Sequence, residues 1–164
     1  MSIQLLPYHP DFDDKTVIWL QNEEIRKEFG FMGEISLSSH KQWINDQYDL
    51  IFFGICESLT GYHVGNLLLH QFESDLNGRY LQIYIGDKDC QGKGYGKQAM
   101  NLALKYCLDN KVCKAIYLHV FSDNFRAKQL YENLKFAKLG IESYQSKNSP
   151  KPRKQILYVK KLYE

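Results

Sequence analysis

The chain has 164 residues, a length typical of one globular domain. Its residues are 44% apolar and 24% charged, a composition that excludes intrinsic disorder. The formal net charge is only +2, so the total charge does not favour a nucleic-acid-binding protein.

The four cysteines suggest neither a disulfide framework nor a metal site. Cys56, Cys90, Cys107 and Cys113 form no CxxC pair and no paired zinc pattern. The first residues lack the basic segment and long apolar run of a signal peptide. No apolar run approaches the roughly 20 residues that a membrane-spanning helix needs. We therefore expect free thiols, no metal, no membrane partner and a cytoplasmic location.

The first third of the chain predicts a short strand followed by two helices. The strand covers residues 3–6, and the first helix covers residues 17–29. The second helix covers residues 38–48, where Ser38 or Ser39 can cap the first turn. A loop with two glycines lies between the helices.

The middle of the chain predicts three antiparallel strands connected in sequence. Residues 50–57, 62–72 and 79–86 are rich in apolar and aromatic side chains. Asn77 and Gly78 separate the second and third strands, and Asn-Gly is a strong hairpin signature.

The remaining segments alternate between helices and strands before a final pair of strands. We expect helices over 96–110 and 125–134, and strands over 115–121, 139–145 and 155–162. Residues 146–154 carry two prolines and four basic residues and predict a loop. The strand–helix–strand order over 79–121 predicts two parallel strands.

These elements predict an α/β (α+β) fold in a single domain spanning residues 1–164. The sheet is expected to be mixed but mostly antiparallel, with about seven strands flanked by about four helices. An exposed last strand would offer an edge for pairing, so a homodimer is possible.

A glycine-rich segment, residues 91–97, lies between a predicted strand and a predicted helix. Its three glycines, at positions 92, 94 and 96, allow close approach of a ligand to the backbone. The exposed amides of a helix start, together with Lys93 and Lys97, suit a phosphate. Gln98 after Lys97 excludes a Walker A motif, and Lys97 replaces the third glycine of a dinucleotide fingerprint. Taken alone, the segment also fits an ordinary glycine-rich turn.

A second pattern, N-x-x-A-x-x-x-Y, begins at Asn124 and ends at Tyr131. Seven residues make about two helical turns, so both side chains lie on one helix face. A tyrosine hydroxyl beside a reacting centre can donate a proton to a leaving group. Taken alone, the pattern is better explained by a capping asparagine and a half-buried tyrosine.

The two patterns in this order resemble the GNAT superfamily of acyl-CoA N-acyltransferases. The Q-x-x-G-x-G motif is formed by Gln91, Gly94 and Gly96, and the specific motifs cover about residues 79–136. The early segments 19–26, 35–36 and 40–43 resemble one branch. That branch contains acetyltransferases of ribosomal-protein N-termini, of spermidine and of nucleotide-linked amino sugars.

The resemblance implies that the chain is an N-acetyltransferase using acetyl-CoA as co-substrate. The pantetheine arm would lie along Ile83, Tyr84 and Ile85. The pyrophosphate would contact the amides of Gln91, Gly92, Lys93, Gly94, Tyr95 and Gly96. Asn124 would help to hold acetyl-CoA, and Tyr131 would be the general acid for the departing thiolate.

Two departures from the family pattern concern the base and a turn. The early glutamate of the strand is absent, because Arg79 and Tyr80 stand there. Glu34 is our candidate for the base, since it lies in the loop where an acceptor pocket would form. His40, whose residue type titrates nearer neutral pH, is the alternative. The usual glycine before Phe136 is replaced by Lys135, which we interpret as a local turn difference.

The acceptor is expected to be a small-molecule amine. Aromatic residues of the first helices, together with Arg26, Lys147, Lys151, Arg153 and Lys154, would suit a nucleotide-linked amino sugar. Spermidine would instead need carboxylates, and a protein N-terminus would need an open groove. A non-catalytic acetyl-CoA sensor is the alternative from another class. Nucleic-acid binding is not expected, because the charge is almost balanced.

Overall fold

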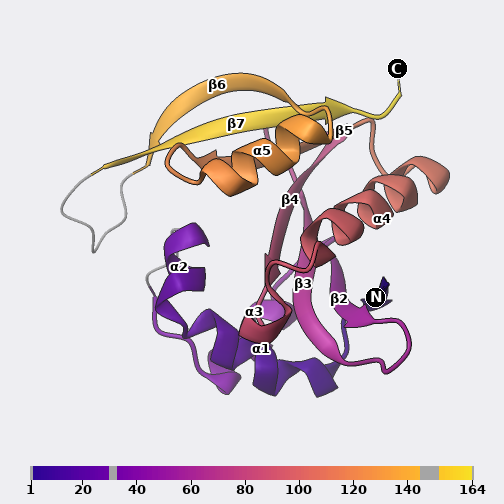
Figure 1. Ribbon diagram of the computed structural model, residues 1–164, viewed down its shortest axis with the longest axis vertical. Coiled ribbons are helices and arrows are strands. Elements are labelled where there is room, and N and C mark those ends of the chain that lie inside the picture. Colours follow the sequence, from indigo (N-terminus) through magenta and orange to yellow (C-terminus); the bar gives the residue numbers. More distant parts are fainter. Residues whose placement is uncertain (1, 30–32, 145–151, 164) are drawn as a thin grey trace.

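The structure is a computed structural model that describes residues 2–29, 33–144 and 152–163 (Figure 1). The strands form one sheet in the order β1-β2-β3-β4-β5-β7-β6. They are β1 (Ile3–Pro7), β2 (Ile51–Glu57), β3 (His63–Gln71), β4 (Gly78–Ile85), β5 (Ala115–Phe121), β6 (Ala137–Tyr144) and β7 (Arg153–Lys161). The α-helices are α1 (Asp13–Leu20), α2 (Glu23–Phe29), α3 (Leu37–Asn45), α4 (Tyr95–Asp109) and α5 (Phe125–Asn133). Two short 3₁₀ turns are η1 (Pro10–Phe12) and η2 (Lys88–Cys90).

The sheet is mixed, as predicted. β4 and β5 are parallel neighbours joined by α4, and every other neighbouring pair is antiparallel. The expectation of an exposed last strand is wrong, because β7 lies between β5 and β6 and has a partner on each side. The edge strands are β1 and β6.

The first predicted helix is divided into two helices, so the described residues contain five α-helices where about four were expected. α1 ends at Leu20 and α2 begins at Glu23. The Asn22 side chain accepts hydrogen bonds from the backbone amides of Glu24 (2.9 Å) and Ile25 (3.4 Å). This is the geometry of an asparagine at a helix start, and it ends one helix and begins the next.

The third helix begins one residue earlier than predicted and has a different cap. Ser36, not Ser38 or Ser39, is its N-cap, and Ser39 completes a capping box by bonding the Ser36 amide. The helix ends at Asn45, so Tyr48 lies beyond it and is 85% exposed.

The sheet separates two apolar clusters. α4 and α5 pack on one face, where the larger cluster contains Leu81, Met100 and Ile116. On the opposite face Trp19 and Ile25 pack against Tyr84. Figure 1 shows α5 beside β6 and β7, with α1, α2 and α3 gathered at the other end of the molecule. The strands between these groups therefore meet helices from both sides.

The four cysteines are free, as predicted, and all four are buried. Within the described residues, no helix combines the length and apolar character required to span a membrane.

Candidate functional site

The candidate site is the place where β4 and β5 separate. The two strands pair only through residues 78–80 of β4 and 115–117 of β5. Beyond these residues, no described strand pairs with the edge of β4 that faces β5. On its other edge, β4 continues to pair with β3. Strand β5 likewise continues to pair with β7 on its other edge. The divergence therefore leaves backbone donors and acceptors available to a ligand, because strand edges present unpaired N–H and C=O groups.

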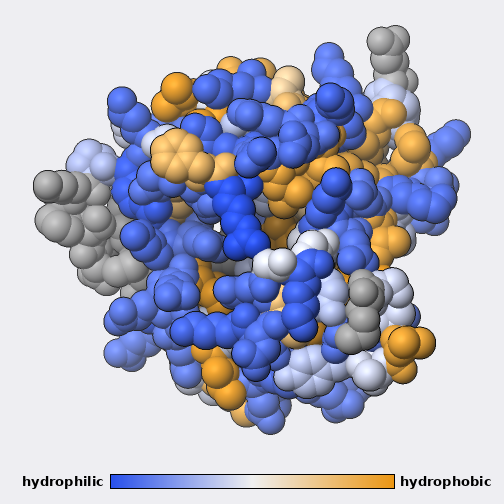
Figure 2. Space-filling view, in the orientation of Figure 1, coloured by the Kyte–Doolittle hydropathy of each residue, from blue (hydrophilic) through white to orange (hydrophobic). Residues whose placement is uncertain are grey.

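A cleft occupies this divergence and has a cavity of about 100 Å³. It is lined by residues 80–83 of β4, by residues 118–121 of β5, and by side chains from α2, α5 and β7. Figure 2 shows a mainly hydrophilic surface that is hollowed between α5 and the first helices. The cleft thus joins a strand edge to both helix layers.

The predicted strand residues divide between the cleft and the core. Ile83 lines the cleft. The side chain of Tyr84 is buried on the opposite face, where its hydroxyl accepts a hydrogen bond from the Asn66 amide at 2.7 Å. Ile85 is the last residue of β4, and its carbonyl accepts a hydrogen bond from the Gln91 side chain at 2.9 Å. Of Tyr84 and Ile85, only backbone groups are therefore suited to a role at the cleft edge.

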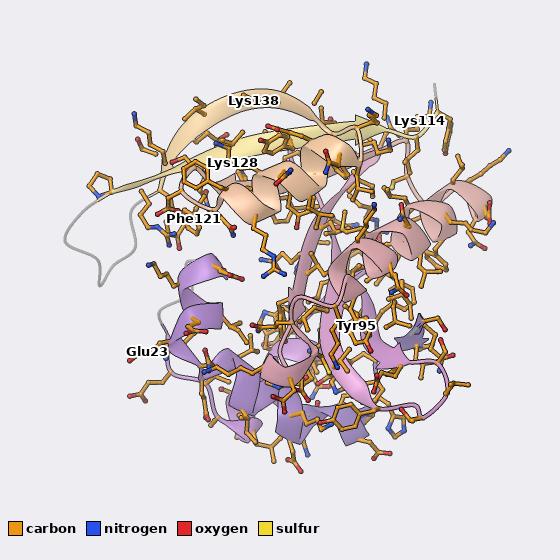
Figure 3. All side chains as sticks on the ribbon, in the orientation of Figure 1. Glu23, Tyr95, Lys114, Phe121, Lys128 and Lys138 are labelled. Atoms are coloured by element: carbon orange, nitrogen blue, oxygen red, sulfur yellow. The ribbon has the colours of Figure 1, made fainter. Side chains whose placement is uncertain are left out.

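The glycine-rich segment leads directly into α4. Gly92 and Gly94 have φ of 77° and 80°, and Gly94 is the N-cap of the helix without any side-chain cap. Positive φ is the conformation that glycine adopts without strain, so these residues permit the turn. Tyr95 is buried, and its hydroxyl donates to the Glu57 carboxylate at 2.7 Å, which anchors the helix start (Figure 3). The side chain of Tyr95 is thus structural. The backbone amides of the segment lie at the start of α4, a helix of 15 residues, and these amides are the groups suited to an anion.

Arg126 is a basic residue near this segment that our sequence analysis overlooked. It lies in the first turn of α5, and a Cβ built on Gly92 would approach its guanidinium to 3.4 Å. A guanidinium beside exposed amides strengthens the case for an anion, because arginine pairs well with phosphate. In the sequence, only its position two residues after Asn124 indicated that Arg126 could lie near the site.

Asn124 caps α5, which also places it in the cleft lining. Its side chain accepts a hydrogen bond from the Ala127 amide at 3.2 Å. The structure therefore supports the capping interpretation, and the same residue lines the cleft.

Tyr131 lies in the cleft and is held by the end of α5. The amide of Phe136 donates to the Tyr131 carbonyl and that of Lys135 to the Glu132 carbonyl, each at 3.0 Å. These two bonds form a Schellman motif, and Lys135 takes the left-handed conformation, with φ of 68°. The Phe136 ring packs edge-on against the Tyr131 ring. Lys135 thus adopts the conformation that glycine normally provides at this position, which explains the departure noted in the sequence.

The Tyr131 side chain is buried, and burial raises the pKa of its hydroxyl. The Glu28 carboxylate and the Tyr80 hydroxyl raise it further. No hydrogen bond of this hydroxyl is seen within the described residues. A protonated hydroxyl directed at a cleft is suited to donating a proton there.

Neither candidate base is part of the cleft lining. Glu34 is exposed in the segment before α3. His40 is buried in α3, where its Nε2 lies 2.9 Å from the Tyr8 hydroxyl and 3.1 Å from an Asp13 carboxylate oxygen. Burial lowers the pKa of His40, with Asp13 acting in the opposite direction. These contacts indicate a structural role for His40.

Glu28 is the carboxylate that does line the cleft, and it was not predicted. It lies in the last turn of α2, where it is exposed to solvent beside the cleft. The surrounding protein, followed by the charge of Glu24, raises the pKa of its carboxyl, and Arg126 opposes this shift. The cleft therefore has a carboxylate on the side of the first helices.

Two of the basic residues expected to hold a diphosphate are engaged elsewhere, one is exposed, and two lie outside the described residues. Arg153 donates to the Lys27 carbonyl at 2.6 Å, pairs with Asp123 at 3.4 Å and stacks 3.5 Å from the Phe121 ring. Arg26 donates to the Gly33 carbonyl. Lys154 is exposed on β7, and Lys147 and Lys151 lie outside the described residues.

Comparisons with known proteins identify relatives of this chain. The chain is 34% identical over 79 residues to a probable spermine N(1)-acetyltransferase of Bacillus subtilis subsp. natto, which covers 48% of this chain and 52% of that protein. The match thus spans about half the length of that relative. An N-acetyltransferase 9-like protein of Caenorhabditis elegans is 26% identical over 156 residues, covering 85% of this chain and 77% of that protein.

Solved structures share the fold over almost the whole chain. A spermidine N-acetyltransferase from Vibrio cholerae, solved in complex with CoA and spermine, superposes with a TM-score of 0.89 at 19% identity. The superposition covers 98% of this chain and 96% of that one. The acetyltransferase (GNAT) family itself matches residues 15–136, a range that contains both motifs and most of the cleft lining. The chain therefore belongs to the acetyltransferase (GNAT) family.

Proposed function

We propose that the protein transfers the acetyl group of acetyl-CoA to a primary amine of a small polycationic molecule, of the spermidine and spermine class. The observation that carries the choice of acceptor is Glu28, a carboxylate that lines the cleft close to Tyr131. A carboxylate at this position attracts an ammonium group by its charge. The relatives named for spermine and spermidine support the same class.

The exposed edge of β4 suits the pantetheine arm and the thioester of acetyl-CoA. Main-chain donors there can pair with its amides and with the oxyanion that develops at the thioester carbonyl. The amides of residues 91–96 and the Arg126 guanidinium suit the pyrophosphate. Acetyl-CoA would then have its thioester between β4 and β5, at the bottom of the cleft.

The reaction forms a C–N bond and breaks the C–S bond in a ternary complex. The amine must lose a proton, because an ammonium group has no lone pair with which to attack. Tyr131 donates its hydroxyl proton to the departing thiolate, and the raised pKa keeps that proton in place until the thiolate forms. Holding amine and thioester together provides much of the remaining acceleration.

The nucleotide-linked amino sugar that we predicted from the sequence has less support. That prediction depended on basic side chains free to hold a diphosphate, and Arg153 and Arg26 bind carbonyl groups of the protein. An amino sugar is therefore the second acceptor to be tested, followed by a protein N-terminus.

The test is acetylation of three acceptors with mass-spectrometric detection of the product. They are spermidine, a UDP-linked amino sugar and a peptide with a free N-terminus. Detection by mass avoids interference from the four cysteine thiols. We expect acetylspermidine as the product. Acetylation of the sugar or the peptide alone would refute the proposed acceptor, and acetyl-CoA binding without turnover would favour a sensor.

Glu28→Gln tests the role of the carboxylate itself. We expect the KM for spermidine to rise about tenfold, as for loss of one hydrogen bond to a charged group, while the affinity for CoA stays unchanged. Glu23→Gln is the matched control, since Glu23 lies on the outer side of the same helix (Figure 3). An unchanged KM in Glu28→Gln would remove this carboxylate from acceptor binding.

A further inference from the structure

We propose that Tyr80 and His119 form the relay that removes the proton of the acceptor amine, with Glu142 as the positioning residue for the imidazole. This inference rests on the proposed acetyl transfer. It assigns the base, the step for which the sequence offered only Glu34 and His40.

The three side chains form a continuous hydrogen-bonded chain. The Tyr80 hydroxyl lies 2.8 Å from Nδ1 of His119, and Nε2 of His119 lies 3.2 Å from Oε2 of Glu142. Because a carboxylate can only accept, the neutral imidazole that satisfies both contacts carries its proton on Nε2. Nδ1 then has its lone pair directed at the Tyr80 hydroxyl, so it is ready to accept a proton.

The chain runs from the cleft to solvent. Tyr80 and His119 both line the cleft, together with Tyr131 and Glu28. The side chain of His119 is 19% exposed and that of Glu142 is 56% exposed. A proton that enters at Tyr80 can therefore leave through His119 without crossing the core.

The placement follows from the divergence of β4 and β5. Tyr80 is the last residue of β4 that pairs with β5, opposite Tyr117. His119 lies two residues further along β5 and on the same face of the sheet, because side chains alternate along a strand. The Tyr80–His119 contact therefore spans the point where the strands part, and the thioester would lie next to it.

The relay acts before the C–N bond forms. One N–H proton of the bound ammonium passes to the Tyr80 oxygen while the Tyr80 hydroxyl proton passes to Nδ1 of His119, which leaves a neutral amine and an imidazolium. The amine then attacks the thioester carbonyl, the C–S bond breaks as Tyr131 protonates the thiolate, and the second N–H proton of the acylated nitrogen restores the Tyr131 hydroxyl. The imidazolium, paired with Glu142, releases its proton to solvent. Burial raises the pKa of Tyr80 to about 12, so the phenol conducts the proton and does not act as a stable phenolate.

Ionisable groups from several elements face this chain. Glu142 belongs to β6, Glu28 to α2 and Tyr131 to α5, while the nearest cleft residue of β7 is the uncharged Gln155. His70 of β3 also faces the relay, because its ring lies 6.4 Å from the Tyr80 ring. Glu142 is the carboxylate in contact with the imidazole.

The test compares pH profiles of kcat/KM for spermidine at saturating acetyl-CoA. A primary alkyl ammonium ordinarily has a pKa near that of lysine, about 10.4, so roughly one amine in a thousand is neutral at pH 7. With the relay intact, we expect a plateau from about pH 7 to pH 9. In His119→Gln, we expect kcat/KM to be about 100-fold lower at pH 7 and to rise about tenfold per pH unit, because only free neutral amine reacts.

Tyr80→Phe interrupts the same relay without removing the imidazole, and we expect it to show the same slope. Its matched control is Tyr117→Phe, which removes a hydroxyl on the same face that donates to Asp75 at 2.7 Å and is not part of the cleft lining. The Kd for CoA and the circular dichroism spectrum verify that each variant is folded.

The outcomes separate the relay from the proposed function. A plateau retained in both His119→Gln and Tyr80→Phe, with wild-type rates, overturns the relay while acetyl transfer stands. A wild-type protein that does not acetylate spermidine overturns the proposed acceptor and the relay together. If His119→Gln fails to fold, the pH slope of Tyr80→Phe decides alone.

Discussion

Replacing Gly96 with alanine should make the unliganded protein more stable and its binding of coenzyme A weaker. Gly96 lies in the first turn of α4, and a Cβ added there meets no protein atom within 4 Å. Alanine in a compatible conformation restricts the unfolded chain and stabilises a protein by about 0.4–1 kcal/mol. In a chain of this length, 1 kcal/mol raises the melting temperature by about 2–4 °C.

The same methyl group would project from the backbone that we assign to the pyrophosphate. Loss of one hydrogen bond to a charged group costs about 1.5–3 kcal/mol, so we expect the Kd for CoA to rise about 10- to 100-fold. Gly94→Ala is the companion variant. Its φ of 80° makes alanine costly by about 1–2 kcal/mol, so both stability and CoA affinity should fall.

Scanning calorimetry gives the melting temperature and titration calorimetry gives the Kd. S-acetylpantetheine, which has no pyrophosphate, is the control ligand, and its binding should be equal in wild type and Gly96→Ala. A Gly96→Ala variant that binds CoA with the wild-type Kd would show that the anion is not held at this turn.

Three further predictions follow from the cleft and its supports. Tyr131→Phe should lower kcat at least 100-fold, because it removes the proton donor. The unfolding free energy should change little, because the hydroxyl makes no hydrogen bond within the described residues. A wild-type kcat in this variant would exclude Tyr131 as the general acid. Lys135→Gly should stabilise the protein by about 0.5–1 kcal/mol by relieving left-handed strain, and an unchanged urea midpoint would contradict this. Burial lowers the pKa of three imidazoles, those of His40, His63 and His70. These imidazoles take up protons more readily when the protein is unfolded, so the unfolding free energy should fall as pH drops below about 6.5. Equal unfolding free energies at pH 7.5 and pH 5.5 would refute this direction of change.

Local patterns were sufficient to predict most of the fold. Strand β5 begins and ends where alternation placed it, and the antiparallel pairing of β3 with β4 and the parallel pair are confirmed. Asn77 and Gly78 do not form the expected two-residue turn, because Gly78 is the first residue of β4 and has no positive φ. The helix boundaries were predicted wrongly where a single polar side chain caps the helix. Asn22 divides a continuous helical pattern because its side chain bonds two backbone amides. Ser36 caps α3, although Ser38 and Ser39 were the predicted caps.

The position of the last strand could not be predicted from local patterns. The sequence pattern of β7 predicts a strand equally well at an edge or in the interior, because both positions accept alternating side chains. Only its pairing with β5 and β6 distinguishes them. Strand order is a property of long-range contacts, which the alternation of side chains does not encode.

The candidate site was predictable where its chemistry is contained in a short motif. The glycines before α4, Asn124 and Tyr131 were found in this way. Glu28, Arg126 and His119 were missed, because each reaches the cleft from a different element and carries no motif of its own. Glu34 was chosen for its place in the loop before α3 and His40 for its residue type, but Glu34 does not line the cleft and His40 lies in a buried network with Tyr8 and Asp13.

The insertion of β7 between β5 and β6 has a consequence for local unfolding. Among the described strands, β6 is bonded only to β7, so these two strands can separate from β5 as a single cooperative unit. This unit holds Gln155 in the cleft wall and Glu142 against His119. Amide hydrogen exchange in β6 and β7 should therefore proceed at one common rate, faster than that of β3, whose neighbours lie on both sides within the interior of the sheet. One wall of the cleft would then open and close in a transition that leaves the strands from β1 to β4 folded.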